Sequence, residues 1–312
     1  MRITVYGTRG GTPSARPGIR HYGGNTTCLR VHSTCLPVGT ALLVDAGTGI
    51  VPASFDLLAE GIRRIVLLMT HYHHDHTLGF PLAPHTFDQA VPIDVHGPRE
   101  HGIGPRQVFQ ALMSAPFFPV DYAVVAGHIT CHDLDAVGTD ALVIHPRDGV
   151  RRADPGELER RAGAGPDALQ ECLVVRTHRT VHSGCTVSYR FEERPTGKVA
   201  VLLTDHEDAE ALPPDLRRHV SDADLLIQDA QYTRAQYRAR TAGFGHGTGD
   251  HAARLLKECD VGRLGLTHHD PMANDPDVDA IVGEARTWLA DNGAAARGGA
   301  VFACADYQVI EV

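Results

Sequence analysis

The densest group of candidate metal ligands in the sequence is the segment Thr70–His76, which reads THYHHDH. It directly follows the apolar run Ile65–Met69, which predicts a buried strand. Histidine and aspartate are common ligands of zinc and similar divalent ions, which take about four ligands at roughly 2.0–2.2 Å. Because a loop at a strand end can direct several side chains to one point, the segment can supply two ligands to each of two ions. A surface histidine cluster is the alternative, and an aspartate between histidines directly after a strand argues against it.

The spacing within this segment resembles that of a known family. It resembles the His-x-His-x-Asp-His signature of the metallo-β-lactamase superfamily, which is matched here by His71, His73, Asp75 and His76. The resemblance implies an α/β fold, a four-layer αββα sandwich of two mixed β-sheets flanked by helices. It also implies a hydrolase that binds two divalent metal ions.

The resemblance further implies three metal ligands beyond this segment. His182 precedes a predicted strand, whereas Asp205 and His268 each follow one. The implied assignment gives one ion to His71, His73 and His182, the other to Asp75, His76 and His268, and makes Asp205 the bridge. His269 is the rival of His268 for the last position. His74 and His206 are expected to be neighbours of ligands rather than ligands.

The types of ligand also indicate which metal ions could bind and which nucleophile they would provide. Imidazole and carboxylate ligands without a thiolate suit zinc best, and manganese and iron are also compatible. Such ions would leave room for a bridging water, whose pKa they lower to about 7. The resulting hydroxide is the expected nucleophile, and Asp75 is the candidate residue that orients it.

Several turns narrow the resemblance to one branch of the superfamily. The segments Tyr6–Pro13, Tyr22–Cys28 and Asp45–Gly49 resemble those of the ribonuclease Z and cyclic-phosphodiesterase branch. Gly245–Thr248 reads GHGT and resembles the Gly-His-Ser-Thr element of that branch, with a glycine in place of the serine. The resemblance implies that His246 contacts the scissile phosphate and helps the leaving group. A solvent-facing loop histidine is the alternative.

Other residues are candidates for supporting roles. Asp229 and Tyr232 follow a predicted strand and resemble an element that supports the site in this branch. Glu207 is a candidate hydrogen-bond partner of His246. Phe117–Pro119 could line an apolar wall for a base, and packing in the core is the alternative for these residues.

Strands and helices must position these side chains. Short apolar runs predict strands, and helical patterns lie between them in both halves of the chain. The predicted strands are Ile3–Tyr6, Thr27–Val31, Ala41–Val44, Ile65–Met69, Ile93–Val95, Tyr122–Val125, Cys172–Val175, Thr186–Phe191, Val199–Leu203, Leu225–Ile227, Leu264–Leu266 and Ala300–Phe302. The predicted helices are Ser54–Glu60, Gln107–Met113, Asp250–Cys259 and Asp277–Leu289. We expect one domain over residues 1–312, with a loop insertion around 147–167 that is rich in charge, glycine and proline.

Composition sets limits on partners and compartment. The 312 residues carry a formal net charge of −9, which lowers the expectation of a large nucleic-acid footprint without excluding a local basic patch. The sequence has no apolar run long enough to span a membrane and no signal-peptide pattern, so we expect a cytoplasmic protein without a membrane partner. The 7 cysteines are widely spaced and are expected to be reduced thiols.

The leading hypothesis is a metal-dependent phosphodiesterase that cleaves a small phosphodiester such as a cyclic nucleotide by a metal-bridging hydroxide. One alternative is a ribonuclease Z-like endonuclease that processes transfer-RNA 3′ ends, which would make nucleic acid the substrate. Others are a hydrolase of carboxylic esters, lactones or thioesters, and a metal-binding protein without turnover. A homodimer is compatible with the branch.

Overall fold

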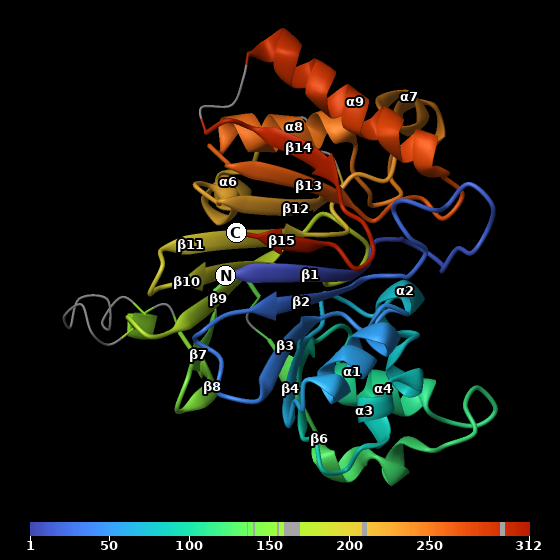
Figure 1. Ribbon diagram of the computed structural model, residues 1–312, viewed down its shortest axis with the longest axis vertical. Coiled ribbons are helices and arrows are strands. Elements are labelled where there is room, and N and C mark those ends of the chain that lie inside the picture. The colour runs from blue at the N-terminus through green and yellow to red at the C-terminus, as the bar shows by residue number, and fades with distance from the viewer. Residues whose placement is uncertain (136, 140, 155, 159–168, 208–210, 294–296) are drawn as a thin grey trace.

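The fold is a sandwich of two β-sheets with helices on both outer faces (Figure 1). The computed structural model describes residues 1–135, 137–139, 141–154, 156–158, 169–207, 211–293 and 297–312. Every count and every absence given for the structure refers to these ranges.

The first sheet has 7 strands within the described ranges and holds the N-terminal half of the chain. Strands β3 to β6 are parallel, whereas β1 and β2 pair antiparallel with their neighbours. The central strands are continuous runs of apolar residues, as expected for parallel strands buried on both faces. Their order is β15 (Val309–Glu311), β1 (Arg2–Gly7), β2 (Cys28–His32), β3 (Thr40–Val44), β4 (Arg64–Leu68), β5 (Ile93–Pro98) and β6 (Ile129–Leu134).

The second sheet has 8 strands within the same ranges and holds most of the C-terminal half. Strands β11 to β14 are parallel, and β7 to β10 add an antiparallel part. Both sheets are therefore mixed. The order is β14 (Ala300–Ala303), β13 (Arg263–Thr267), β12 (Leu225–Asp229), β11 (Lys198–Leu203), β10 (Val187–Glu193), β9 (Leu173–Arg179), β7 (Ala141–His145) and β8 (Gly149–Ala153).

Helices cover the outer face of each sheet, and separate apolar clusters fill the layers between them. One cluster lies between the sheets, one joins the first sheet to its helices, and one joins the second sheet to its helices. The first sheet is covered by α1 (Ile50–Ala59), α2 (His74–Thr77), η1 (Phe80–Leu82), α3 (Pro84–Phe87) and α4 (Pro105–Leu112). The second is covered by α6 (Pro214–Val220), α8 (Gly249–Glu258) and α9 (Asp275–Asn292). The predicted four-layer αββα sandwich is confirmed.

Four short helical turns complete the described elements. They are η2 (Tyr122–Val124), η3 (Ala126–His128), α7 (Arg234–Gln236) and the π-helical turn η4 (Tyr237–Thr241). The predicted strand Tyr122–Val125 is therefore wrong. The Asp121 carboxylate accepts a hydrogen bond from the Ala123 amide and so caps a 3₁₀ turn there.

The predicted insertion around 147–167 is wrong in its first part. Residues Gly149–Ala153 form β8, which pairs with β7 as an antiparallel hairpin at the edge of the second sheet. Arginines 151 and 152 make this strand polar, so its apolar pattern is too weak to predict. Residues 155 and 159–168 lie outside the described ranges. The single-domain assignment stays a prediction.

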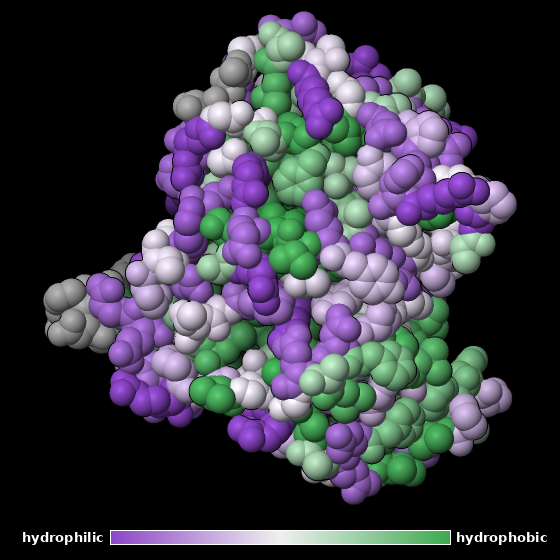
Figure 2. All heavy atoms as spheres, in the orientation of Figure 1, coloured by the Kyte–Doolittle hydropathy of each residue, from purple (hydrophilic) through white to green (hydrophobic). Residues whose placement is uncertain are grey.

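The surface over the helices of the first sheet is partly apolar. Figure 2 shows apolar side chains gathered over α1, α2 and α3. The exposed large side chains of this region are Phe55, Leu58, Leu78, Leu82 and Phe87. Among the described residues, no helix combines the length and the apolar character needed to cross a lipid bilayer.

One hydrogen bond ties the two sheets together beneath the histidine-rich segment. The Tyr189 hydroxyl, on β10, donates to the Met69 carbonyl at the end of β4 over 2.7 Å, and Tyr189 is fully buried. Replacing Tyr189→Phe would leave that carbonyl without this donor, because the phenyl ring offers none. We expect a loss of about 1–3 kcal/mol in the free energy of unfolding. Equilibrium unfolding in urea measures it.

The matched control is Tyr307→Phe, which removes a hydroxyl from a side chain that is 59% exposed. It should change the free energy of unfolding by no more than about 0.5 kcal/mol. Equal unfolding midpoints for the two variants would contradict the assigned role of the Tyr189 hydroxyl.

Candidate metal centre

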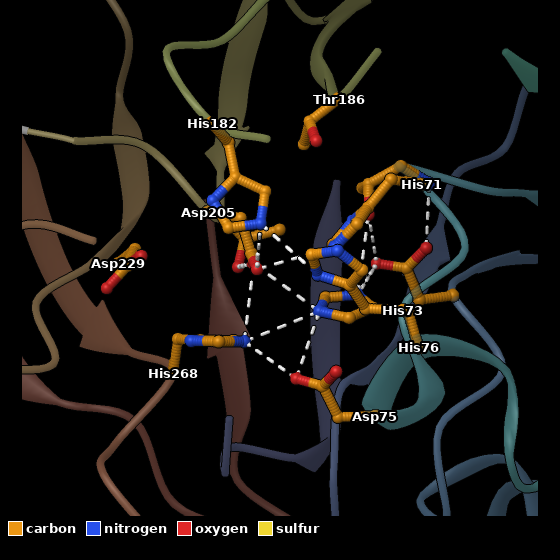
Figure 3. Close-up of polar contacts among 12 residues, drawn as sticks. His71, His73, Asp75, His76, His182, Thr186, Asp205, Asp229 and His268 are labelled. Atoms are coloured by element: carbon orange, nitrogen blue, oxygen red, sulfur yellow. Dashed lines mark hydrogen bonds and ion pairs between the residues drawn. The ribbon is translucent and has the colours of Figure 1, made fainter. Parts of the chain in front are cut away.

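The site lies where strand ends of both sheets meet (Figure 3). From the first sheet, β3 leads to Asp45 and β4 leads to His71, whereas β11 leads to Asp205 and β13 to His268 in the second. Three of these residues have a positive φ, 61° at Asp45, 52° at Asp205 and 59° at His268. Few residues other than glycine adopt this left-handed conformation, so the chain bends sharply at each strand end to point the side chain into the site.

The first group of donors consists of His71, His73, His182 and Asp205. One ligand atom of each lies within 4.8 Å of those of the others. His182 Nε2 and His73 Nδ1 approach to 3.3 Å, and His71 Nε2 lies 3.5 Å from Asp205 Oδ2. His71 Nε2 and Asp205 Oδ2 are buried and have no hydrogen-bond partner among the described residues. Since buried polar atoms are normally satisfied, these atoms fit an arrangement that binds a cation.

The second group consists of Asp75, His76, Asp205 and His268, and all four are buried. His268 Nε2 lies 3.1 Å from Asp75 Oδ2 and 3.3 Å from Asp205 Oδ1. His76 Nε2 and His268 Nε2 approach to 3.3 Å. Figure 3 shows these atoms pointing toward one another. Asp205 belongs to both groups, which is the position that a bridging ligand requires.

Charges within the cluster keep its carboxylates ionised. Burial alone would raise the pKa of Asp205, but His268, His76 and His71 outweigh it and lower that pKa well below its usual range. In turn, burial disfavours protonation of His268, yet Asp205 and Asp75 raise the pKa of its imidazole to about 9. The carboxylates are therefore negatively charged at neutral pH and available to a cation.

Asp45 is a functional residue that sequence reasoning missed. Its carboxylate accepts hydrogen bonds from the Thr70 amide over 2.7 Å and the Thr70 hydroxyl over 2.8 Å, and it pairs with His76 Nδ1 over 2.8 Å. This contact leaves Nε2 of His76 directed to the cluster, as the supporting carboxylate of a metal ligand does. The position of Asp45 directly after a buried strand is a signal for such a role, but Asp45 also begins a glycine-rich turn, which offers a purely structural reason for the residue.

Other contacts orient the remaining side chains. The Gly11 amide donates to Asp75 Oδ2 over 2.7 Å, and His182 Nδ1 lies 2.8 Å from the Gly245 carbonyl. A Cβ on Gly10 would lie 2.3 Å from His268 Cε1, so only glycine allows the loop to pass so close. The glycine-rich N-terminal turn thus packs directly against the cluster.

The structure shows which of the neighbouring histidines lie within the donor groups. His269 Nε2 lies 3.0 Å from the Cys304 carbonyl, and its ring packs against Tyr22, so His268 alone of the pair joins the cluster. His206 Nδ1 accepts a hydrogen bond from the Val181 amide outside both donor groups. His74 is exposed at the rim of the adjacent cavity.

His246 and Asp229 form an ion pair beside the second group. His246 Nδ1 lies 2.8 Å from Asp229 Oδ2, and the His246 ring stacks on that of His268 with centroids 4.9 Å apart. The suggested partner Glu207 is wrong, because its carboxylate accepts hydrogen bonds from the Gly243 and Gly245 amides instead. Glu207 therefore holds the loop that carries His246.

A cavity of about 580 Å³ opens over these residues. Its floor includes Asp75, Asp205 and His246, and its aromatic wall comes from Tyr72, Tyr232 and Phe244. The suggested wall at Phe117–Pro119 is wrong. Phe118 packs against the core beneath α4, while Phe117 is 82% exposed away from this cavity. Phe244 was missed because a lone aromatic residue in a glycine-rich loop gives no sequence signal.

The amino-acid sequence is similar to those of several known proteins. No family model matches the sequence. The chain is 30% identical to a ribonuclease Z of Haloferax volcanii over 304 residues, which cover 86% of this chain and 84% of that protein. It is 28% identical to a ribonuclease Z of Haloarcula marismortui over 306 residues, which cover 92% and 91% of the two chains.

A solved structure shares the same fold. The metallo-β-lactamase fold protein YhfI from Bacillus subtilis superposes with a TM-score of 0.63 at 18% identity, over 100% of this chain and 99% of that one. The fold, the clustered histidines and aspartates, and the full-length relatives agree on a hydrolase fold with a divalent metal centre. The chain belongs to the ribonuclease Z-like branch of the metallo-β-lactamase superfamily.

Proposed function

We propose that this protein is a binuclear metal-dependent phosphodiesterase. The observation that carries the proposal is the contact of His246 Nδ1 with Asp229 Oδ2, 2.8 Å long, beside the two groups of candidate metal ligands that share Asp205. With His268, these two residues form a third group that could hold an ion. A phosphodiester gains negative charge in its transition state and releases an alkoxide, so a proton donor next to the metals suits this reaction.

The donor sets fit two divalent ions that share Asp205. We assign one ion to His71, His73 and His182 and the other to Asp75, His76 and His268. The absence of thiolate donors from both groups suits zinc, and manganese and iron are also compatible. When bound, such ions stabilise negative charge on the phosphate and lower the pKa of water in the site.

His246 acts as the proton donor in this proposal. The Asp229 carboxylate accepts the Nδ1 hydrogen, which leaves Nε2 for the substrate. His246 lines the cavity, and its side chain is 15% exposed. A phosphate placed over the donor groups therefore meets the imidazole, which transfers its proton to the leaving oxygen.

Asp75 has a second role besides holding an ion. The Gly11 amide and His268 both contact Oδ2, which fixes the orientation of the carboxylate at the floor of the cavity. His76 and His268 outweigh the effect of burial and lower the pKa of Asp75, so it accepts rather than donates hydrogen bonds. We propose that it orients the attacking water.

RNA is the substrate class that the comparisons favour. The full-length relatives carry the name ribonuclease Z, and this supports the endonuclease alternative better than the small-substrate hypothesis. The exposed residues Arg238 and Arg240 lie just before the loop of Phe244 and His246 in the chain. Arginines there would contact the phosphates of a polynucleotide, while Phe244 would stack on a base.

A small phosphodiester is the second candidate. Only a short hairpin, β10–β11, connects His182 to Asp205, so the described residues between them form no long arm for grasping a folded RNA. The cavity of about 580 Å³ is in the range of small-molecule sites. The net charge of −9 also suits a small substrate better than a large polyanion.

The two candidates predict different substrate preferences. With zinc or manganese present, we expect cleavage of a precursor transfer RNA with a 3′ extension at a kcat/KM at least about tenfold above that for cyclic nucleotides. The affinity for RNA should fall steeply as salt increases, because counterions are released when phosphates are bound. A preference for a cyclic nucleotide, with no RNA binding at low salt, would establish the second candidate instead.

The variant His246→Ala should lower kcat for a precursor transfer RNA with a 3′ extension by about 10²–10⁴-fold, because the proton donor for its alkoxide leaving group is lost. Its bound metal, measured by inductively coupled plasma mass spectrometry, should equal that of the wild type. Asp229→Asn should lower kcat as well, whereas Phe117→Ala, outside the cavity, should not. Full activity of His246→Ala on this substrate would contradict the proposed role of His246 as proton donor.

The variant Asp45→Asn should weaken zinc binding by about 10–100-fold, because His76 loses the carboxylate that orients it. Competition with a chromophoric chelator measures the affinity. The control is Asp291→Asn, which changes an exposed carboxylate near the end of α9. If both variants bound zinc like the wild type, Asp45 would have no role in positioning the proposed ligand.

A further inference from the structure

A second cavity, of about 740 Å³, lies between the two sheets and away from the metal centre. Its wall on the first sheet includes Thr40 and Arg64, the first residues of β3 and β4. These two residues lie at the opposite ends of the parallel strands from the metal centre, about 16 Å away at roughly 3.3 Å per residue, whereas the lining residue His96 is level with Leu68 in β4. The facing wall is the hairpin β7–β8 (Figure 1). This inter-sheet cavity is therefore separate from the proposed active site.

The inter-sheet cavity is strongly basic in a chain whose net charge is −9. Its acidic residues are Asp94 and Asp148, and its arginines are Arg63, Arg64, Arg147, Arg151 and Arg152. Arg64 pairs with Asp94, Arg147 with Glu171 and Arg151 with Glu157. Arg152 donates a hydrogen bond to the Asp133 carbonyl. Arg63 has no carboxylate partner among the described residues. The guanidinium of Arg63 is therefore available to an anion beside the other arginines, and its forked donors match the geometry of a phosphate.

A buried histidine adds a polar group that the protein itself leaves unsatisfied. His96, on β5, lines the cavity and is 5% exposed, and neither of its ring nitrogens has a hydrogen-bond partner among the described residues. Burial, together with His132 and Arg152, lowers the pKa of His96 to about 3, so the ring is neutral at neutral pH. Unsatisfied buried nitrogens call for an explanation, and a bound ligand supplies one.

The imidazoles also give the cavity a flat wall. The rings of His96 and His132 stack with centroids 4.5 Å apart and planes 13° apart. His132 is the more exposed of the two, with 41% of its side chain accessible. Its free face is suited to stacking with a planar ring, as aromatic side chains do in nucleotide sites.

We propose that the inter-sheet cavity binds a phosphomonoester that carries a planar ring, such as a nucleoside monophosphate. The arginines hold the phosphate, and the stacked histidines contact the ring. The volume lies within the roughly 300–1,000 Å³ of small-molecule sites and is much larger than inorganic phosphate needs. This proposal does not depend on the activity of the metal centre.

Isothermal titration of the metal-loaded protein with adenosine monophosphate, inorganic phosphate and adenosine tests the proposal. We expect adenosine monophosphate to bind more tightly than either fragment. Arg63→Ala and His96→Leu should each weaken that binding by at least about tenfold, as expected when a hydrogen bond to a charged phosphate or a ring contact is lost. Arg106→Ala, an exposed arginine on α4 outside the cavity, should leave it unchanged.

The variant Asp205→Ala separates this site from the metal centre. Binding of adenosine monophosphate that persists in Asp205→Ala and is lost in Arg63→Ala would establish the cavity as the site. Binding that is unchanged in Arg63→Ala, or equally tight binding of adenosine, would overturn the proposal. So would arginine-dependent binding of single-stranded RNA without binding of the monophosphate. Arg63 is exposed, so its replacement should not disturb folding, which thermal unfolding verifies.

Discussion

The burial of Asp205 is the constraint on which the rest of the site depends. A carboxylate that is 1% exposed would be very costly without compensating charge. The raised pKa values of His76 and His268 indicate that these two imidazoles provide it. His71 and His182 also lie against the carboxylate. His71 and His76 come from the end of β4, whereas His182 and His268 come from segments of the second sheet. The two sheets must therefore pack in one register, with their strand ends aligned, before the cluster can exist.

The cluster of candidate ligands was predictable because several of its residues stand close together in the sequence, in a dense run of histidines directly after a strand. The contact of Asp45 with His76 and the loop contacts of Glu207 were not, because these pairings depend on distances across the fold that no local pattern encodes. The hairpin β7–β8 was missed for a related reason, since its polar strand lacks the alternation that predicts strands. Net charge favoured a small substrate, but it averages over the whole surface and cannot locate arginines near a site.

The two ends of the sandwich differ in electrostatic character. The metal centre surrounds ionised carboxylates with imidazoles, whereas the inter-sheet cavity places arginines near the neutral ring of His96. Strands β3, β4 and β5 connect the two, and the His96 carbonyl accepts the Met69 amide just before the histidine-rich segment. A single sheet thus offers an environment for cations at one end and for anions at the other.

The left-handed backbone at Asp45, Asp205 and His268 has a consequence for how this sequence would change over evolutionary time. Each such conformation costs on the order of 1–3 kcal/mol in a residue other than glycine, so function holds three residues against the preference of the backbone. A descendant released from selection for metal binding would gain stability through glycine or asparagine at these positions. Such substitutions in a related chain would mark a lineage that has kept the sandwich and abandoned its chemistry.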